Sequence, residues 1–276
     1  MNIYILISVA FFSIIHGYAS SYQIGSSWSR KHIHSASEKV RYLQSSVGEV
    51  GARATLFYIG QRNNKHWAVT NNHVCPGNKK NKCLNQWIVF FYHKNAQGEP
   101  LKGNIVDVPL SRPDLDFSLV EIKFKNLASF ESLPFALSFS HSPPYHHQEL
   151  ISLGYGGWLN EYGSLTIEEN SEDCKVFSYD DDIKLSSDPD STAPLNHKVY
   201  SFIHGCDASH GDSGSPLLDE QSHEVIGLLW SGKYPKPKGI SQDDFYLLPY
   251  EQLWNGLNYA VPAFMISDKI ESFFAK

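Results

Sequence analysis

The sequence predicts an all-β protein that ends in a single α-helix. Short runs of β-branched and aromatic residues recur along the chain between turn residues, which is typical of β-sandwiches and barrels. A proline-containing linker over residues 133–147 separates two groups of these runs. The last residues instead repeat apolar side chains at a helical spacing. Two β halves followed by a terminal helix are therefore expected.

The first half is expected over residues 49–132 and the second over residues 145–266. The runs that predict strands cover residues 54–59, 67–70, 87–92 and 117–122 in the first half, and 149–154, 175–179 and 224–230 in the second. Residues 180–194 are acidic and rich in turn formers, and residues 233–251 contain several prolines. Both segments are expected to form loops.

The C-terminal helix is expected over residues 267–276. Ser267 is a candidate N-cap, and Asp268 suits the positive N-terminal end of a helix. Ile270, Phe273 and Phe274 would share one face, which predicts that this face packs on the β structure.

Composition narrows the class of protein. The chain has 276 residues, 42% of them apolar, and a formal net charge of −6 with no long basic run. Nucleic-acid binding usually shows as a basic patch, so no nucleic-acid partner is expected. This length can bury the core of one domain or of two closely packed ones.

The amino terminus is expected to be a secretory signal over residues 1–19. The stretch from Ile3 to Ile15 is apolar and too short to span a bilayer, and small residues lead to a cleavage site after Ala19. No Lys or Arg precedes it, and the alternatives are an uncleaved anchor or a buried strand. Residues 20–48 would form a propeptide or an N-terminal arm, and residues 49–276 the folded domain. We expect a secreted protein, extracellular or periplasmic, with no stable membrane insertion after cleavage.

The four cysteines are expected to form disulfides in an oxidising compartment. Four cysteines allow three connectivities, of which we favour Cys75–Cys83 and Cys174–Cys206. The sequence contains no CxxC pair of the kind that binds a metal ion. The cluster of His141, His146 and His147 lies in the linker without ligand spacing, so no metal or cofactor is expected.

The most informative motif is the segment 211–216, which reads GDSGSP. A serine between glycines can present its hydroxyl to a substrate, and such a turn can aim backbone N–H groups at a developing oxyanion. A serine nucleophile requires a base and an orienting acid elsewhere. His73, after the apolar run 67–70, offers an imidazole whose usual pKa of about 6.5 suits a base. Asp116, before the apolar run 117–120, offers the acid, and Asp114 is its rival.

The order His, Asp, Ser and the strings around them resemble the trypsin/chymotrypsin-like serine peptidases, closest to secreted bacterial trypsin-like and glutamyl-endopeptidase-like members. The resemblance implies two packed six-stranded antiparallel β-barrels with the active site between them. His73, Asp116 and Ser213 would form the catalytic triad, and the N–H groups of Gly211 and Ser213 the oxyanion hole. It implies a monomeric serine endopeptidase that acts on proteins or peptides through an acyl-enzyme. The alternative is a non-catalytic binding protein on this scaffold.

The resemblance also bears on specificity and activation. Asp207, six residues before Ser213, would select Lys or Arg side chains, or else would have a structural role. Ser231 and Gly232 would bind the substrate backbone. Leu229 stands where glutamyl endopeptidases carry a histidine, which argues against glutamate preference. The family often pairs the acid before the nucleophile, here Asp212, with a new amino terminus. No suitable amino-terminal string exists in this chain, so another partner for Asp212 is expected.

Overall fold

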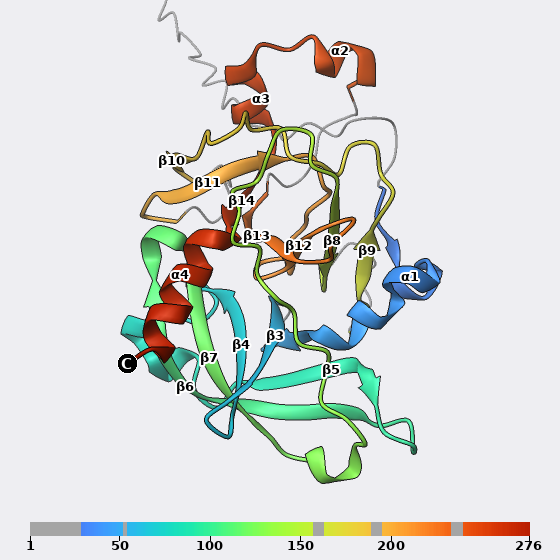
Figure 1. Cartoon of the computed structure of the whole chain (residues 1–276), viewed down its shortest axis with the longest axis vertical. Coiled ribbons are helices and arrows are strands. Elements are labelled where there is room, and N and C mark those ends of the chain that lie inside the picture. The colour runs from blue at the N-terminus through green and yellow to red at the C-terminus, as the bar shows by residue number, and fades with distance from the viewer. Residues whose placement is uncertain (1–28, 52–53, 157–162, 189–194, 233–239) are drawn as a thin grey trace, which may run out of the picture.

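The computed structural model describes residues 29–276 except 52–53, 157–162, 189–194 and 233–239. It confirms the expected all-β architecture with a C-terminal helix, and all the strand pairings within its two sheets are antiparallel. The first barrel lies at the bottom of Figure 1 and the second β unit above it.

The first unit is a closed six-stranded barrel in the order β2-β3-β4-β7-β6-β5. Its strands are β2 (Val47–Val50), β3 (Ala54–Arg62), β4 (Lys65–Asn71), β5 (Trp87–Lys94), β6 (Pro100–Arg112) and β7 (Phe117–Phe124). Side chains alternate between the two faces of a strand. On β3, Leu56 and Tyr58 accordingly join the core inside this barrel, while Phe57 joins a larger core shared with the second unit.

The second unit is an eight-stranded sheet in the order β1-β9-β8-β12-β13-β14-β11-β10. Its strands are β1 (Lys31–His32), β8 (Leu150–Gly154), β9 (Thr166–Glu168), β10 (Lys184–Ser186), β11 (Val199–His204), β12 (Pro216–Asp219), β13 (Val225–Ser231) and β14 (Asn258–Pro262). The second unit is therefore an eight-stranded sheet and not the second closed six-stranded barrel that the resemblance implied. The sheet is longer because β1, from the N-terminal segment, and β10 extend its two ends.

The segment before the first barrel packs on the domain as an arm. After β1 it forms the 3₁₀ turn η1 (Ile33–Ser35), the helix α1 (Glu38–Arg41) and the 3₁₀ turn η2 (Tyr42–Ser46). Ile33, Val40 and Leu43 are buried in the shared core. Figure 1 shows this arm beside β9, with which β1 pairs. The predicted signal over residues 1–19 lies outside the described residues, as does the segment 20–28.

The C-terminal helix α4 spans Ala263–Phe274, so the predicted cap at Ser267 is wrong. The helix follows β14 directly, and Pro262 is both the last residue of that strand and the N-cap of the helix. Ser267 lies in the second turn and is 4% exposed. Among the described residues no helix is long and apolar enough to cross a membrane.

Two loop predictions and one strand prediction are also wrong in part. The helix α2 (Gln242–Tyr246) and the start of α3 (Tyr250–Gly256) lie in the expected loop 233–251. The hydroxyl of Ser241 caps α2 by accepting a hydrogen bond from the Asp244 N–H at 3.2 Å. β10 lies in the expected loop 180–194, and segment 175–179 makes only isolated bridges. The remaining short elements are the 3₁₀ turns η3 (Gly77–Lys82), η4 (Pro113–Leu115) and η5 (Leu127–Ser129).

Both disulfides favoured from the sequence are present. Cys75 pairs with Cys83 and closes the loop that follows His73. Cys174 pairs with Cys206 and ties the segment after β9 to the chain that leads into residues 211–216.

Candidate active site

Asp116 stands at a sharp turn just before β7. The 3₁₀ turn η4 ends there, and Asp116 takes a left-handed conformation with φ of 35°. This conformation is uncommon outside glycine, although aspartate adopts it more readily than most residues. The side chain of Asp116 is fully buried. The turn therefore places a buried carboxylate directly before β7.

That carboxylate contacts His73 twice. Its Oδ2 lies 2.7 Å from Nδ1 of the His73 ring, and its Oδ1 accepts the His73 backbone N–H at 2.9 Å. β4 pairs with β7 so that Asn71 faces Phe117, and this register brings the turn after β4 beside Asp116. An acid that accepts from Nδ1–H leaves Nε2 of the ring as the acceptor, as a general base requires.

Two asparagines before His73 strengthen this arrangement. The Asn71 side-chain amide and the Asn72 backbone N–H both donate to the Asp116 carbonyl oxygen, at 3.0 and 2.9 Å. The turn 71–73 is thus fixed to the same residue that orients the ring.

The pKa of His73 is raised. Burial acts to lower the pKa, but the charge and the hydrogen bond of Asp116, with a smaller effect from the charge of Asp188, outweigh burial. The ring remains 24% exposed, so a substrate can reach it. A neutral imidazole in this place would act as a base at a pH above the usual range for histidine.

Asp114, the rival acid, is occupied elsewhere. Its carboxylate accepts two hydrogen bonds from the Arg112 guanidinium, at 2.9 Å from Nε and 2.7 Å from Nη2. Its side chain is 40% exposed. Of the two candidate acids, the structure therefore brings Asp116 to the histidine.

Residues 211–216, which contain Ser213, form the serine segment. This segment is hydrogen-bonded to the first barrel through Thr55 of β3. The Thr55 N–H donates to the Ser213 carbonyl oxygen at 2.9 Å, and the Thr55 hydroxyl donates to the Gly211 carbonyl oxygen at 2.8 Å. Thr55 is fully buried, and its carbonyl oxygen accepts a bond from the hydroxyl of Thr70 at 2.7 Å. Because Thr70 lies three residues before His73, these bonds bring the serine segment to the strand end that carries the histidine.

The glycines on either side of Ser213 are required by this geometry. Gly211 and Gly214 have φ of 105° and 89°, in the region that favours glycine. A Cβ at Gly214 would lie 2.0 Å from the Thr55 carbonyl oxygen. The Gly214 N–H also donates to the Leu229 carbonyl oxygen on β13 at 3.1 Å. The segment is therefore held between the two β units.

The residues expected to bind substrate lie at the end of β13 and before the serine segment. Ser231 donates its hydroxyl to the carboxylate of Asp188, which the sequence did not single out. A Cβ at Gly232 would lie 3.0 Å from the Cβ of Ala208, so these two residues are in close contact. Leu229, which was expected to replace the histidine of glutamyl endopeptidases, is 2% exposed.

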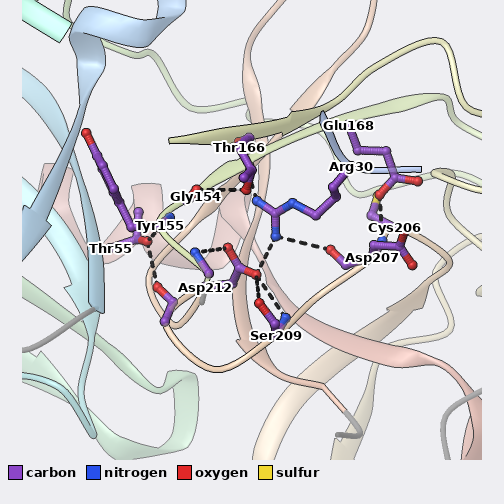
Figure 2. A network of polar contacts seen from close by, with 12 residues as sticks. Arg30, Thr55, Gly154, Tyr155, Thr166, Glu168, Cys206, Asp207, Ser209 and Asp212 are labelled. Atoms are coloured by element: carbon purple, nitrogen blue, oxygen red, sulfur yellow. Dashed lines mark hydrogen bonds and ion pairs between the residues drawn. The ribbon is translucent and has the colours of Figure 1, made fainter. Parts of the chain in front are cut away.

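Asp207 and Asp212 both contact the N-terminal arm. Asp207 is 5% exposed, and its Oδ2 accepts the Ser29 N–H at 2.7 Å. Asp212 is fully buried and forms an ion pair with Arg30, as Figure 2 shows. The sequence predicted that Asp212 has a partner other than a new amino terminus, but it did not identify Arg30, which stands in a polar stretch and reads as a solvated charge.

The three histidines of the linker make different contacts. No group of three or more potential ligands that could hold a metal ion occurs among the described residues. His146 stacks on His147 with ring centroids 3.8 Å apart, and His141 lies 3.8 Å from Glu271.

Much of the chain matches a known protein family. Residues 54–228 match the model of the trypsin-like peptidase domain family. None of the curated proteins searched matches the chain.

Solved structures share the fold at low sequence identity. An inactive serine-to-alanine mutant of Rv3671c from M. tuberculosis H37Rv has a TM-score of 0.53 and 16% identity, over 92% of this chain and 98% of that one. The protease domain of MamO from Magnetospirillum magneticum has a TM-score of 0.51 and 12% identity, over 83% and 97%. At such identities the likeness establishes the fold alone.

Proposed function

Because the chain belongs to the trypsin-like peptidase domain family, we propose that it is a secreted serine endopeptidase that hydrolyses peptide bonds with Ser213, His73 and Asp116. The observation that carries the proposal is the double contact between the buried Asp116 carboxylate and His73. A buried acid bonded to Nδ1 of a partly exposed imidazole is the arrangement that makes a serine hydroxyl nucleophilic.

In the proposed reaction the Ser213 oxygen attacks the carbonyl carbon of a peptide bond. His73 accepts the hydroxyl proton at Nε2 and donates it to the leaving amine, so that an acyl-enzyme forms. Water then attacks the ester by the same route, and the proton returns to Ser213. Asp116 stabilises the imidazolium formed in each step. The N–H groups of Gly211 and Ser213 would stabilise the oxyanion, and the positive φ of Gly211 supports this role.

Substrate binding is proposed at the end of β13. Ser231 and Gly232 would pair with the substrate backbone, as an added strand does. Asp188 accepts the Ser231 hydroxyl and would therefore lie beside a substrate bound there. The bond from the Ser29 N–H to Asp207 favours a structural role for that carboxylate over the selection of basic side chains.

Secretion is proposed on two grounds. The amino terminus has the pattern of a cleaved signal. Two disulfides are typical of proteins from oxidising compartments. We further propose that the protein acts as a monomer on protein or peptide substrates and requires no cofactor.

Turnover of a mixed peptide library tests the proposed function. The purified protein should cleave peptides, and Ser213→Ala should reduce kcat by about 10⁶-fold, as in other serine triads. Asp114→Asn should cleave at the wild-type rate because Asp114 pairs with Arg112 on the surface. Peptide binding without cleavage would instead identify a non-catalytic binding protein, and unchanged turnover in Ser213→Ala would identify another nucleophile.

A further inference from the structure

The N-terminal arm places the buried guanidinium of Arg30 beside Asp212, the residue that precedes Ser213. β1 pairs with β9, with Lys31 opposite Ile167 and His32 opposite Thr166. Arg30 immediately precedes β1 and is therefore carried into the second unit, where it is 2% exposed. A buried cation is tolerated only when it is paired and hydrogen-bonded. The pairing of β1 with β9 therefore fixes the position of Arg30.

The Arg30 guanidinium bonds to Asp212, just before Ser213, and to the chain that leads into the serine segment. Its Nη1 pairs with the carboxylate of Asp212 and lies 3.4 Å from the Asp207 carbonyl oxygen. Its Nη2 lies 3.5 Å from the Thr166 carbonyl oxygen on β9. Figure 2 shows the guanidinium between these groups. One planar side chain therefore links β9 to the chain on each side of residues 208–211.

The Asp212 carboxylate is fully buried, and the groups that donate hydrogen bonds to it set its orientation. Its Oδ1 accepts the Gly156 N–H at 3.0 Å, and its Oδ2 accepts the N–H and the hydroxyl of Ser209 at 2.9 and 3.1 Å. A Cβ at Gly156 would lie 2.2 Å from Oδ2, so there is no room for a larger residue. Arg30 supplies the only full positive charge that an ion pair brings to Asp212 in the described part of the chain.

We propose that Arg30 is a positioning residue that holds the serine segment in its reactive conformation, so that the arm stays attached in the active enzyme. A cut after Arg30 would then switch the enzyme off, the reverse of activation by a newly freed amino terminus. The arm supports this retention, since Ile33 and Leu43 are fully buried in the shared core and Ser29 binds Asp207. The catalytic part of this proposal rests on the proposed function.

Arg30→Met tests the proposal in the full chain, with Lys31→Met as its matched control. Lys31 is the next residue, and its ammonium pairs with the Glu169 carboxylate at 3.0 Å. Two readouts are used: the rate at which a fluorophosphonate labels Ser213, and hydrogen exchange in the peptide that contains residues 209–215. A shift of about 1 Å in a reacting group can cost about 10²-fold in rate. We expect Arg30→Met to label about 100-fold more slowly and to exchange faster in that peptide, while Lys31→Met behaves as wild type.

Arg30→Lys keeps the proposal falsifiable if Arg30→Met fails to fold. A lysine can pair with Asp212 but cannot span the Thr166 and Asp207 carbonyl oxygens at once. We expect an intermediate labelling rate and intermediate exchange. Wild-type labelling and exchange in a folded Arg30→Met or Arg30→Lys would overturn the proposal. So would an active secreted form whose amino terminus begins after residue 30.

The two readouts separate this proposal from the proposed function. If the wild type is not labelled at Ser213, the proposed function fails. The exchange of residues 209–215 in the variants then still decides whether Arg30 orders the segment. Faster exchange supports the ordering role, and unchanged exchange overturns it.

Discussion

Two acids raise the pKa of His73, and they act on it in different ways. Asp116 is buried and bonded to the ring, whereas Asp188 acts on the ring through its charge. Both stabilise the imidazolium and raise the pKa of His73, against the lowering effect of burial. Asp116 also fixes the orientation of the ring through its hydrogen bond to Nδ1. The two acids therefore predict different mutant behaviour.

Asp116→Asn should lower kcat by about 10⁴-fold, because an amide that donates to Nδ1 selects the wrong tautomer. Asp114→Asn is the matched control, since it removes a nearby carboxylate that pairs only with Arg112 in the described contacts. Steady-state hydrolysis of a peptide substrate measures both. A small effect of Asp116→Asn, or an equal loss in the control, would contradict the assigned role.

Asp188→Asn should move the acid limb of the kcat/KM profile to lower pH. The sign follows because the Asp188 charge raises the pKa of His73, so its removal lets the ring lose its proton at lower pH. The neutral ring is the base, and activity would then persist further into the acid range. Profiles of the two proteins over pH 4 to 9 would show the shift. An unmoved acid limb would mean that Asp188 has no effect on His73.

Among the elements, β3 has a role that its sequence pattern did not reveal. Its first residues contribute to the barrel core through Leu56 and also hold the serine segment through Thr55. The Thr55 hydroxyl donates to the Gly211 carbonyl oxygen and accepts the Tyr155 N–H at 3.0 Å. One side chain thus connects the first barrel, the end of β8 and the serine segment.

Thr55→Val should lower the free energy of unfolding by about 1–3 kcal/mol, because it leaves two buried backbone groups without their partner. It should also reduce kcat, since the Gly211 carbonyl oxygen loses its anchor. Thr55→Ser retains the hydroxyl and is the control. Denaturant unfolding and steady-state kinetics check both effects. A Thr55→Val protein as stable and active as Thr55→Ser would show that the link is unimportant.

At the level of elements, the sequence predicted the strands whose apolar runs are continuous. The runs at 54–59, 67–70 and 117–122 all lie in strands, because their side chains are buried on both faces between barrel and shared core. β6, 13 residues long, was missed because most of its residues are half-exposed or exposed and no apolar run marks it. The start of α4 was placed four residues late because the apolar face of residues 263–266 reads as a continuation of β14.

At the scale of the whole molecule, the site depends on residues that meet only after folding. The strings around His73, Asp116 and Ser213 were readable because each has a local pattern. Arg30, Thr55 and Asp188 have none, and they act through contacts that join residues far apart in the sequence, such as Thr55 with Gly211, 156 positions apart. The need of Asp212 for a partner was the one sequence signal that pointed toward Arg30.

The two disulfides should contribute unequally to the stability of the whole chain. They close segments with sequence separations of 8 and 32 residues. On the chain-entropy model these loops correspond to about 2.6 and about 3.7 kcal/mol. The double variant Cys174→Ala/Cys206→Ala should therefore unfold at lower denaturant than Cys75→Ala/Cys83→Ala. The reverse order in an unfolding titration would contradict the model.

The central claim is that Ser213 is a nucleophile activated by His73 and Asp116. The most direct measurement is mass spectrometry of the protein after reaction with a fluorophosphonate, followed by mapping of the adduct. The account predicts one adduct per chain, on Ser213, that forms slowly in Asp116→Asn and is absent from Ser213→Ala. An unlabelled wild-type protein, or an adduct on another residue, would contradict it.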